Sequence, residues 1–225
     1  MTHLELIEET IAFVKETLQG AEGGHDWFHK QRVLNNTLLI AKDEKVNVLI
    51  VSLGALLHDI ADAKFYKGDE TVGPKMATEF LNSLDISQDV ITHVVRIIEN
   101  ISFKSGLKSS KNKKESFNSK ELQVVQDADR LDAIGAIGIA RTFNYGGFKN
   151  RAIYNPDIPP NLKMTKEEYK KSTAPTINHF YEKLLLLKDK MNTPTGKKLA
   201  EERHNYMLGF LEQFYREWNP LNNKV

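Results

Sequence analysis

Cysteine is absent from the 225-residue sequence. This absence excludes disulfide bonds and metal sites built on thiolates, so any metal must be held by imidazole and carboxylate groups. A charge excess of one sign is also missing, because 31 Lys and Arg residues balance 30 Asp and Glu residues for a formal net charge of +1. This balance indicates neither a nucleic-acid partner nor an anionic membrane surface.

Long hydrophobic runs are scarce as well. The longest runs from Val46 to Leu57, is interrupted by Asn47 and Ser52, and is too short to span a bilayer. The first residues form an acidic amphipathic segment, which is not the pattern of a secretory signal peptide. We therefore expect a cytoplasmic protein without a membrane or nucleic-acid partner.

Convincing alternating strand patterns and internal repeats are missing too, whereas apolar residues recur at helical spacing. Residues 3–19 place Leu6, Ile7, Thr10, Ile11 and Val14 on one stripe. The sequence predicts an all-α orthogonal bundle in one domain, residues 1–225, with a helical C-terminal part over residues 165–219. Further helices are expected from Asp26 to about Lys42, from Pro74 to about Leu84, after Ser87 to about Asn100, around Asp129, from Thr165 as a long helix, and from Thr193-Pro194 to before Pro220.

The most informative motif is the doublet His58-Asp59, which ends the apolar run. A segment that is apolar on nearly every side belongs in a core, where ionisable side chains are rarely found without partners. A divalent metal ion would satisfy both residues. The alternative is a helix that simply reaches the surface at His58.

Two further segments carry residues of the same type. The doublet is preceded by the segment Gly24-His25-Asp26-Trp27-Phe28-His29-Lys30-Gln31-Arg32-Val33. It is followed by the segment Gln126-Asp127-Ala128-Asp129-Arg130-Leu131-Asp132. The order His, His-Asp, Asp resembles the HD-domain metal-dependent phosphohydrolases, and the flanks resemble a small bacterial subgroup. The resemblance implies an orthogonal bundle of the HD-domain type with its metal motifs in residues 25–132. It implies four ligands: His29, His58, Asp59 and Asp129.

Two further carboxylates, Asp127 and Asp62, lie near these ligands in the sequence. Asp127 and Asp129 differ by about 200° around a helix, so one ion is not expected to bind both. Asp129 matches the family position, and Asp127 remains the alternative. Asp62 lies four residues after His58, on the same face if that helix continues, where related proteins carry an acidic residue near the attacking water. We expect a catalytic role for Asp62, against the alternative of a surface charge at the helix end.

Four further residues are candidates for binding the substrate. His25 lies four residues before His29, a spacing typical of a metal pair, but the preceding glycines indicate that it lines the pocket instead. Arg32 follows His29 by one turn and can orient a carboxylate or bind phosphate. Lys64 and Lys104 can neutralise a phosphate, although most lysines are solvated and Arg32 can also form an ordinary surface ion pair.

The resemblance predicts a phosphohydrolase with one divalent ion, Mn²⁺ in first place and Fe, Co, Ni, Zn or Mg as alternatives. Its expected partner is a small phosphorylated substrate, in first place a (deoxy)nucleoside triphosphate cleaved with release of pyrophosphate. A nucleotidase or an alarmone hydrolase is the enzymatic alternative. A regulatory module that keeps a metal without catalysis is the rival from another class, and a homodimer is left open.

Overall fold

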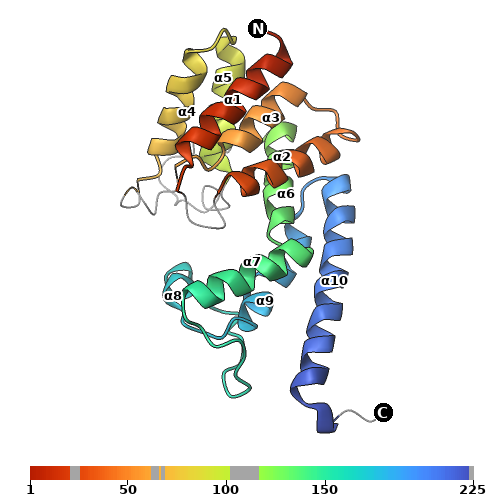
Figure 1. The fold of residues 1–225 in the computed structure, drawn as a ribbon. Coiled ribbons are helices and arrows are strands. Elements are labelled where there is room, and N and C mark those ends of the chain that lie inside the picture. The colour runs from red at the N-terminus through yellow and green to blue at the C-terminus, as the bar shows by residue number, and fades with distance from the viewer. Residues whose placement is uncertain (21–25, 62–65, 67–68, 102–116, 223–225) are drawn as a thin grey trace. The chain divides into compact units, whose positions relative to one another are not determined.

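The computed structural model describes residues 1–20, 26–61, 66, 69–101 and 117–222. Within these ranges every regular element is a helix, which confirms the predicted all-α fold (Figure 1). The chain divides into two compact units, Met1–Asp129 and Arg130–Val225. The assignment of residues 1–225 to a single domain stays a prediction. No helix in the described ranges combines the length and the apolar character needed to cross a membrane.

The first unit is organised around one buried helix. Its elements are α1 (His3–Thr17), α2 (Trp27–Ala41), α3 (Val48–Leu57), α4 (Val72–Asn82), α5 (Gln88–Asn100) and α6 (Lys120–Asp132), the last of which continues beyond the unit. Every residue of α3 from Leu49 to Leu57 is buried, and α3 contacts α1, α2 and α5. A Cβ at Gly54 would lie only 3.3 Å from Ile97 of α5 and 3.4 Å from Val125 of α6, so glycine permits this close packing.

Side-chain caps start the two helices that lead to the candidate site, and the sequence predicted the first of them. Asp26 accepts the backbone N–H of His29 and starts α2, and Asn47 accepts the N–H groups of Leu49 and Ile50 and starts α3. Such bonds satisfy amides that have no partner within the helix. The starts of the helix that carries His29 and of the helix that ends at the His58-Asp59 doublet are therefore determined locally.

The second unit contains α7 (Gly135–Phe148), α8 (Lys166–Lys171), α9 (Asn178–Glu182) and α10 (Pro194–Trp218), with short 3₁₀ turns at Leu184–Leu186, Lys188–Lys190 and Pro220–Asn222. The rings of Phe143, Phe180 and Phe210 pack together, with centroids 5.8 to 6.1 Å apart. These contacts join α7, α9 and α10 around an aromatic core of their own.

One predicted helix is much shorter than expected. The capping box at Thr165 and Glu168 is present, but α8 ends at Lys171 and does not form a long C-terminal helix. Pro175 follows four residues later, and proline and the residue before it are poorly compatible with a continuing helix. The final helix begins where predicted, since Thr193 caps α10 by accepting the Gly196 N–H.

Candidate metal centre

His29 is held at the start of α2 with its ring in the interior. Its backbone N–H donates to Asp26 Oδ1 at 3.0 Å, and only 2% of the residue is exposed. A buried imidazole needs polar partners, because an unsatisfied polar group in a core is unfavourable. The capping bond therefore fixes the backbone from which a buried donor projects.

The doublet lies where α3 ends. His58 is the C-cap residue of α3 and is 6% exposed, whereas Asp59 is partly exposed. The His58 Nδ1 lies 2.8 Å from the Ala55 carbonyl oxygen. A carbonyl can only accept, so Nδ1 carries the hydrogen and Nε2 presents its lone pair. This is the tautomer that a metal ion requires at Nε2.

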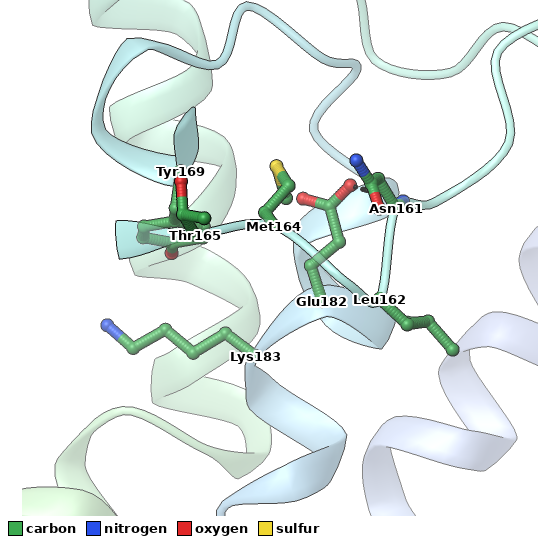
Figure 2. A pocket seen from close by; sticks show the side chains of 7 residues that line it. All are labelled: Asn161, Leu162, Met164, Thr165, Tyr169, Glu182 and Lys183. Atoms are coloured by element: carbon green, nitrogen blue, oxygen red, sulfur yellow. Dashed lines mark hydrogen bonds between the residues drawn. The ribbon is translucent and has the colours of Figure 1, made fainter. Parts of the chain in front are cut away.

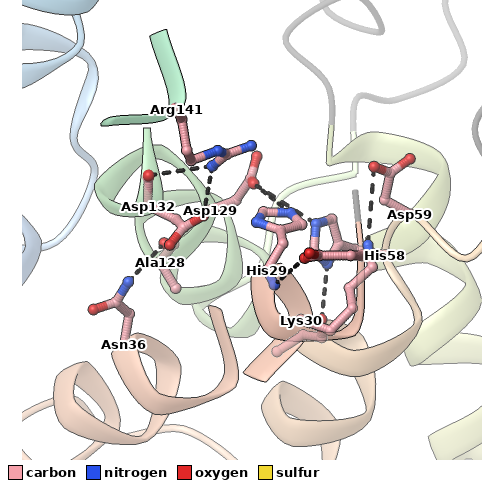
Figure 3. Close-up of polar contacts among 11 residues, drawn as sticks. His29, Lys30, Asn36, His58, Asp59, Ala128, Asp129, Asp132 and Arg141 are labelled. Carbon is pink, nitrogen blue, oxygen red and sulfur yellow. Dashed lines mark hydrogen bonds and ion pairs between the residues drawn. The ribbon is translucent and has the colours of Figure 1, made fainter. Parts of the chain in front are cut away.

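His29, His58 and Asp59 lie close enough together to hold one ion. One donor atom from each lies within 4.8 Å of the other two (Figure 3). Two donors that are each about 2.1 Å from an ion are about 3.0 to 3.4 Å apart, so modest side-chain movement would bring all three onto one ion. Two imidazoles and a carboxylate are suitable ligands for a divalent transition metal. The group therefore fits such an ion.

Asp129 comes to the same place from α6. Its Oδ1 lies 3.6 Å from His29 Nε2 and 3.7 Å from His58 Nε2. Burial alone would raise the pKa of Asp129, but its interactions with His58, His29 and Lys30 hold the pKa well below its ordinary value. The carboxylate is therefore ionised at neutral pH, the form in which it can bind a cation.

A hydrogen bond joins α2 to α6 beside Asp129. The Asn36 side-chain amide donates to the Ala128 carbonyl at 3.3 Å, next to Asp129 in the chain. Asp127 is completely buried, and Asp132 pairs with Arg141 at 2.5 Å. The arrangement favours Asp129 over Asp127 as the carboxylate nearest the histidines, and its role as a ligand stays a prediction.

The other sequence candidates are placed less fully. His25, Asp62, Lys64 and Lys104 lie outside the described residues. Arg32 lies on α2 and is partly exposed. The i, i+4 argument for Asp62 held only if the helix continued past His58. Since α3 ends at Leu57, that condition is not met, and the role of Asp62 stays a prediction that rests on the family resemblance.

Lys30 is a residue of the site that the sequence did not reveal. It follows His29, it is 0% exposed, and its Nζ lies 3.9 Å from Asp59 Oδ2. A signal was present, because Lys30, Val33, Leu34 and Thr37 have the spacing of one helical face and are all buried. A charged residue on such a face indicates a specific partner in the interior.

A separate pocket of about 260 Å³ lies within the second unit (Figure 2). Glu182 and Lys183 reach it from the end of α9, and Thr165 and Tyr169 line it with Asn161, Leu162 and Met164. The Tyr169 hydroxyl lies 2.8 Å from His179 Nδ1. Burial, assisted by the charges of Lys183 and Arg151, lowers the pKa of His179 to about 3. We therefore expect a neutral His179 at physiological pH.

This lowered pKa predicts a loss of stability in acid. The pKa of His179 falls from an ordinary 6.5 to about 3 on folding, so the unfolded chain binds more protons between these values. The associated stability is complete above about pH 6.5 and is lost as the pH falls toward 3, by at most about 5 kcal/mol. We expect His179→Gln to flatten the fall in unfolding free energy between pH 7 and pH 4, as measured by urea denaturation.

His3→Gln is the matched control, because His3 is exposed and its replacement should leave the pH dependence unchanged. The same slope in wild type and His179→Gln would contradict the assignment of a buried neutral imidazole at position 179.

Comparisons with known proteins agree with this geometry. Residues 27–134 match the model of the HD domain family. The crystal structure of a HD-superfamily hydrolase from Bacillus thuringiensis is 44% identical, with a TM-score of 0.77 over 97% of this chain and 99% of that one. The matched segment contains all four residues that the sequence predicts as ligands.

A second relative is the Bacillus subtilis protein YpgQ, which is 36% identical over 219 residues that cover 96% of each chain. Its crystal structure in complex with ADP has a TM-score of 0.73, over 96% of this chain and 97% of that one. The family model, the near-complete coverage and the order of the histidine and aspartate motifs lead to one assignment. This chain belongs to the HD-domain superfamily.

Proposed function

We propose that the protein is a metal-dependent phosphohydrolase that acts on a soluble nucleotide. The leading reaction is hydrolysis of a (deoxy)nucleoside triphosphate to its monophosphate with release of pyrophosphate. The observation that carries the proposal is the convergence of two buried imidazoles, His29 and His58, with the partly exposed carboxylates of Asp59 and Asp129. The exposed side of these carboxylates gives the centre access to solvent and substrate.

Membership in the HD superfamily, which includes the Bacillus thuringiensis hydrolase, supports hydrolysis. The ADP complex of YpgQ supports a nucleotide as the ligand. A nucleoside triphosphate is also a small, anionic substrate, which suits a centre built around a divalent cation. A cytoplasmic location and Mn²⁺ as the native ion are parts of this proposal.

In the proposed reaction His29, His58, Asp59 and Asp129 hold the ion. A divalent ion in such a site makes water more acidic and stabilises charge on a phosphoryl oxygen. Water adds to the α-phosphorus, the bond from this phosphorus to the oxygen that bridges to the β-phosphate breaks, and the β- and γ-phosphates leave as pyrophosphate. Asp62 positions the water or accepts its proton, and His25, Arg32, Lys64 and Lys104 contact the phosphates.

A screen of the Mn²⁺-loaded protein against nucleoside mono-, di- and triphosphates tests this function, provided that pyrophosphate and phosphate are measured separately. We expect pyrophosphate from triphosphates, and no turnover by Asp59→Ala or by protein treated with a chelator. Phosphate released from monophosphates would indicate a nucleotidase, and pyrophosphate released from a guanosine 3′-diphosphate would indicate an alarmone hydrolase. Tight binding without turnover of any substrate would indicate a regulatory module.

A further inference from the structure

Lys30 combines a fully buried side chain with a position inside the candidate metal centre. The residue is 0% exposed and belongs to the face of α2 that also buries Val33 and Leu34. An ammonium group loses its hydration when it is buried, which is strongly unfavourable unless negative groups lie nearby. The interior of this unit must therefore compensate a positive charge at that point.

Lys30 has a charge partner in Asp59, whose Oδ2 lies 3.9 Å from Lys30 Nζ (Figure 3). The same positive charge also acts on Asp129. These are the two carboxylates expected to face a divalent ion. Lys30 and the ion therefore act on the same negative charges.

Burial separates Lys30 from the lysines that usually bind phosphate. A substrate that approaches from solvent meets the partly exposed Asp59 and Asp129 before it can meet a side chain with no exposed surface. The charge of Lys30 therefore acts on the carboxylates and on any ion bound between them. Within a protein this action is strong, because charges a few ångströms apart are poorly screened.

We propose that Lys30 is the internal counter-cation of the metal centre. In the metal-free protein its ammonium compensates Asp59 and holds the carboxylate in place, and in the metal-bound protein it repels the divalent ion and weakens its binding. This role rests on the proposed metal site. It makes Lys30 a positioning residue that limits metal affinity, in contrast to a ligand, whose loss would lower the affinity.

Lys30→Met tests the proposal, because methionine has a similar length and no charge. We expect the dissociation constant for Mn²⁺, measured by calorimetry on the full chain, to fall by about tenfold or more, since one repulsive charge is removed. The melting temperature of the metal-free variant should fall below that of the metal-free wild type. Saturating Mn²⁺ should raise the melting temperature of the variant by more than it raises that of the wild type. Lys30→Gln should change both quantities in the same direction.

Lys42→Met is the matched control. Lys42 is exposed and caps the far end of α2, about 18 Å along the helix from Lys30. At ordinary ionic strength a charge at that distance is screened, so its loss should leave the Mn²⁺ affinity unchanged.

Unchanged or weaker Mn²⁺ binding by Lys30→Met and Lys30→Gln would overturn the proposal. Failure of both variants to fold in saturating Mn²⁺ would also overturn the proposal, because the bound ion should then compensate the charge of Asp59 without Lys30. The proposed function is tested separately by the wild type. If the wild type binds no divalent ion, the metal site itself is wrong, whereas equal binding by wild type and variants removes only the role of Lys30.

Discussion

His58→Ala is expected to bind Mn²⁺ at least about 100-fold more weakly than the wild type and to lose measurable hydrolysis. Loss of a group that merely orients a ligand already weakens metal binding by about 10- to 100-fold, so loss of a ligand should exceed that range. The same result is expected for alanine at His29, Asp59 and Asp129. Metal content after gel filtration and calorimetric titration of the metal-free protein measure the effect.

His93→Ala is the control for the removal of a histidine from the same unit. His93 lies on α5, where its Nε2 is 3.0 Å from Ser119 Oγ, and its replacement should leave the bound metal unchanged. Circular dichroism of each variant separates loss of the ion from loss of the fold. Stoichiometric Mn²⁺ in His58→Ala would remove His58 from the ligand set.

The two aspartates of α6 should respond differently to the same substitution. Asp129→Asn keeps the shape of the side chain but removes the charge beside His29 and His58, so it should bind Mn²⁺ weakly. Asp127→Asn changes a residue that is completely buried, so its effect should be on stability. Full metal content in Asp129→Asn, together with loss of metal in Asp127→Asn, would show that Asp127 is the ligand and Asp129 is not.

Asp62→Asn should keep its metal and its fold while kcat falls by a factor of about 10² to 10⁴, the usual loss when a positioned acid or base is removed. Only Ile60 and Ala61 separate Asp62 from Asp59 in the sequence. The expected ligand set, His29, His58, Asp59 and Asp129, leaves Asp62 free for a role in the chemistry. Steady-state kinetics of metal-saturated protein, with metal content measured on the same sample, test the expectation.

The Asp62→Asn comparison separates chemistry from binding, because loss of a group that acts only in the transition state lowers kcat and kcat/KM together. Asp69→Asn is a suitable control, since Asp69 is exposed and accepts from the Thr71 amide at 2.9 Å. Near-normal turnover by Asp62→Asn would remove this residue from the mechanism and make His25 the next proton carrier to test.

Local chemistry in the sequence was enough to predict the helical class and the starts of several helices. Caps such as Asp26 and Thr193 act on amides two or three residues away, so they are readable without tertiary structure. The buried character of α3 was also readable, because a run that is apolar on every side has no solvent face. The early end of α8 at Lys171 differed from expectation, since helix ends also depend on surrounding packing.

The sequence by itself determined which kinds of donor are available, because a chain without cysteine offers imidazole and carboxylate groups in a fixed order. Only the tertiary structure decided which of them meet. The fold brings Asp129 of α6 to within 3.7 Å of both histidines and leaves Asp127 buried, and the same interior encloses Lys30 beside Asp59. Helical periodicity gives the face on which a residue lies, but the neighbour of that face comes from helices distant in sequence.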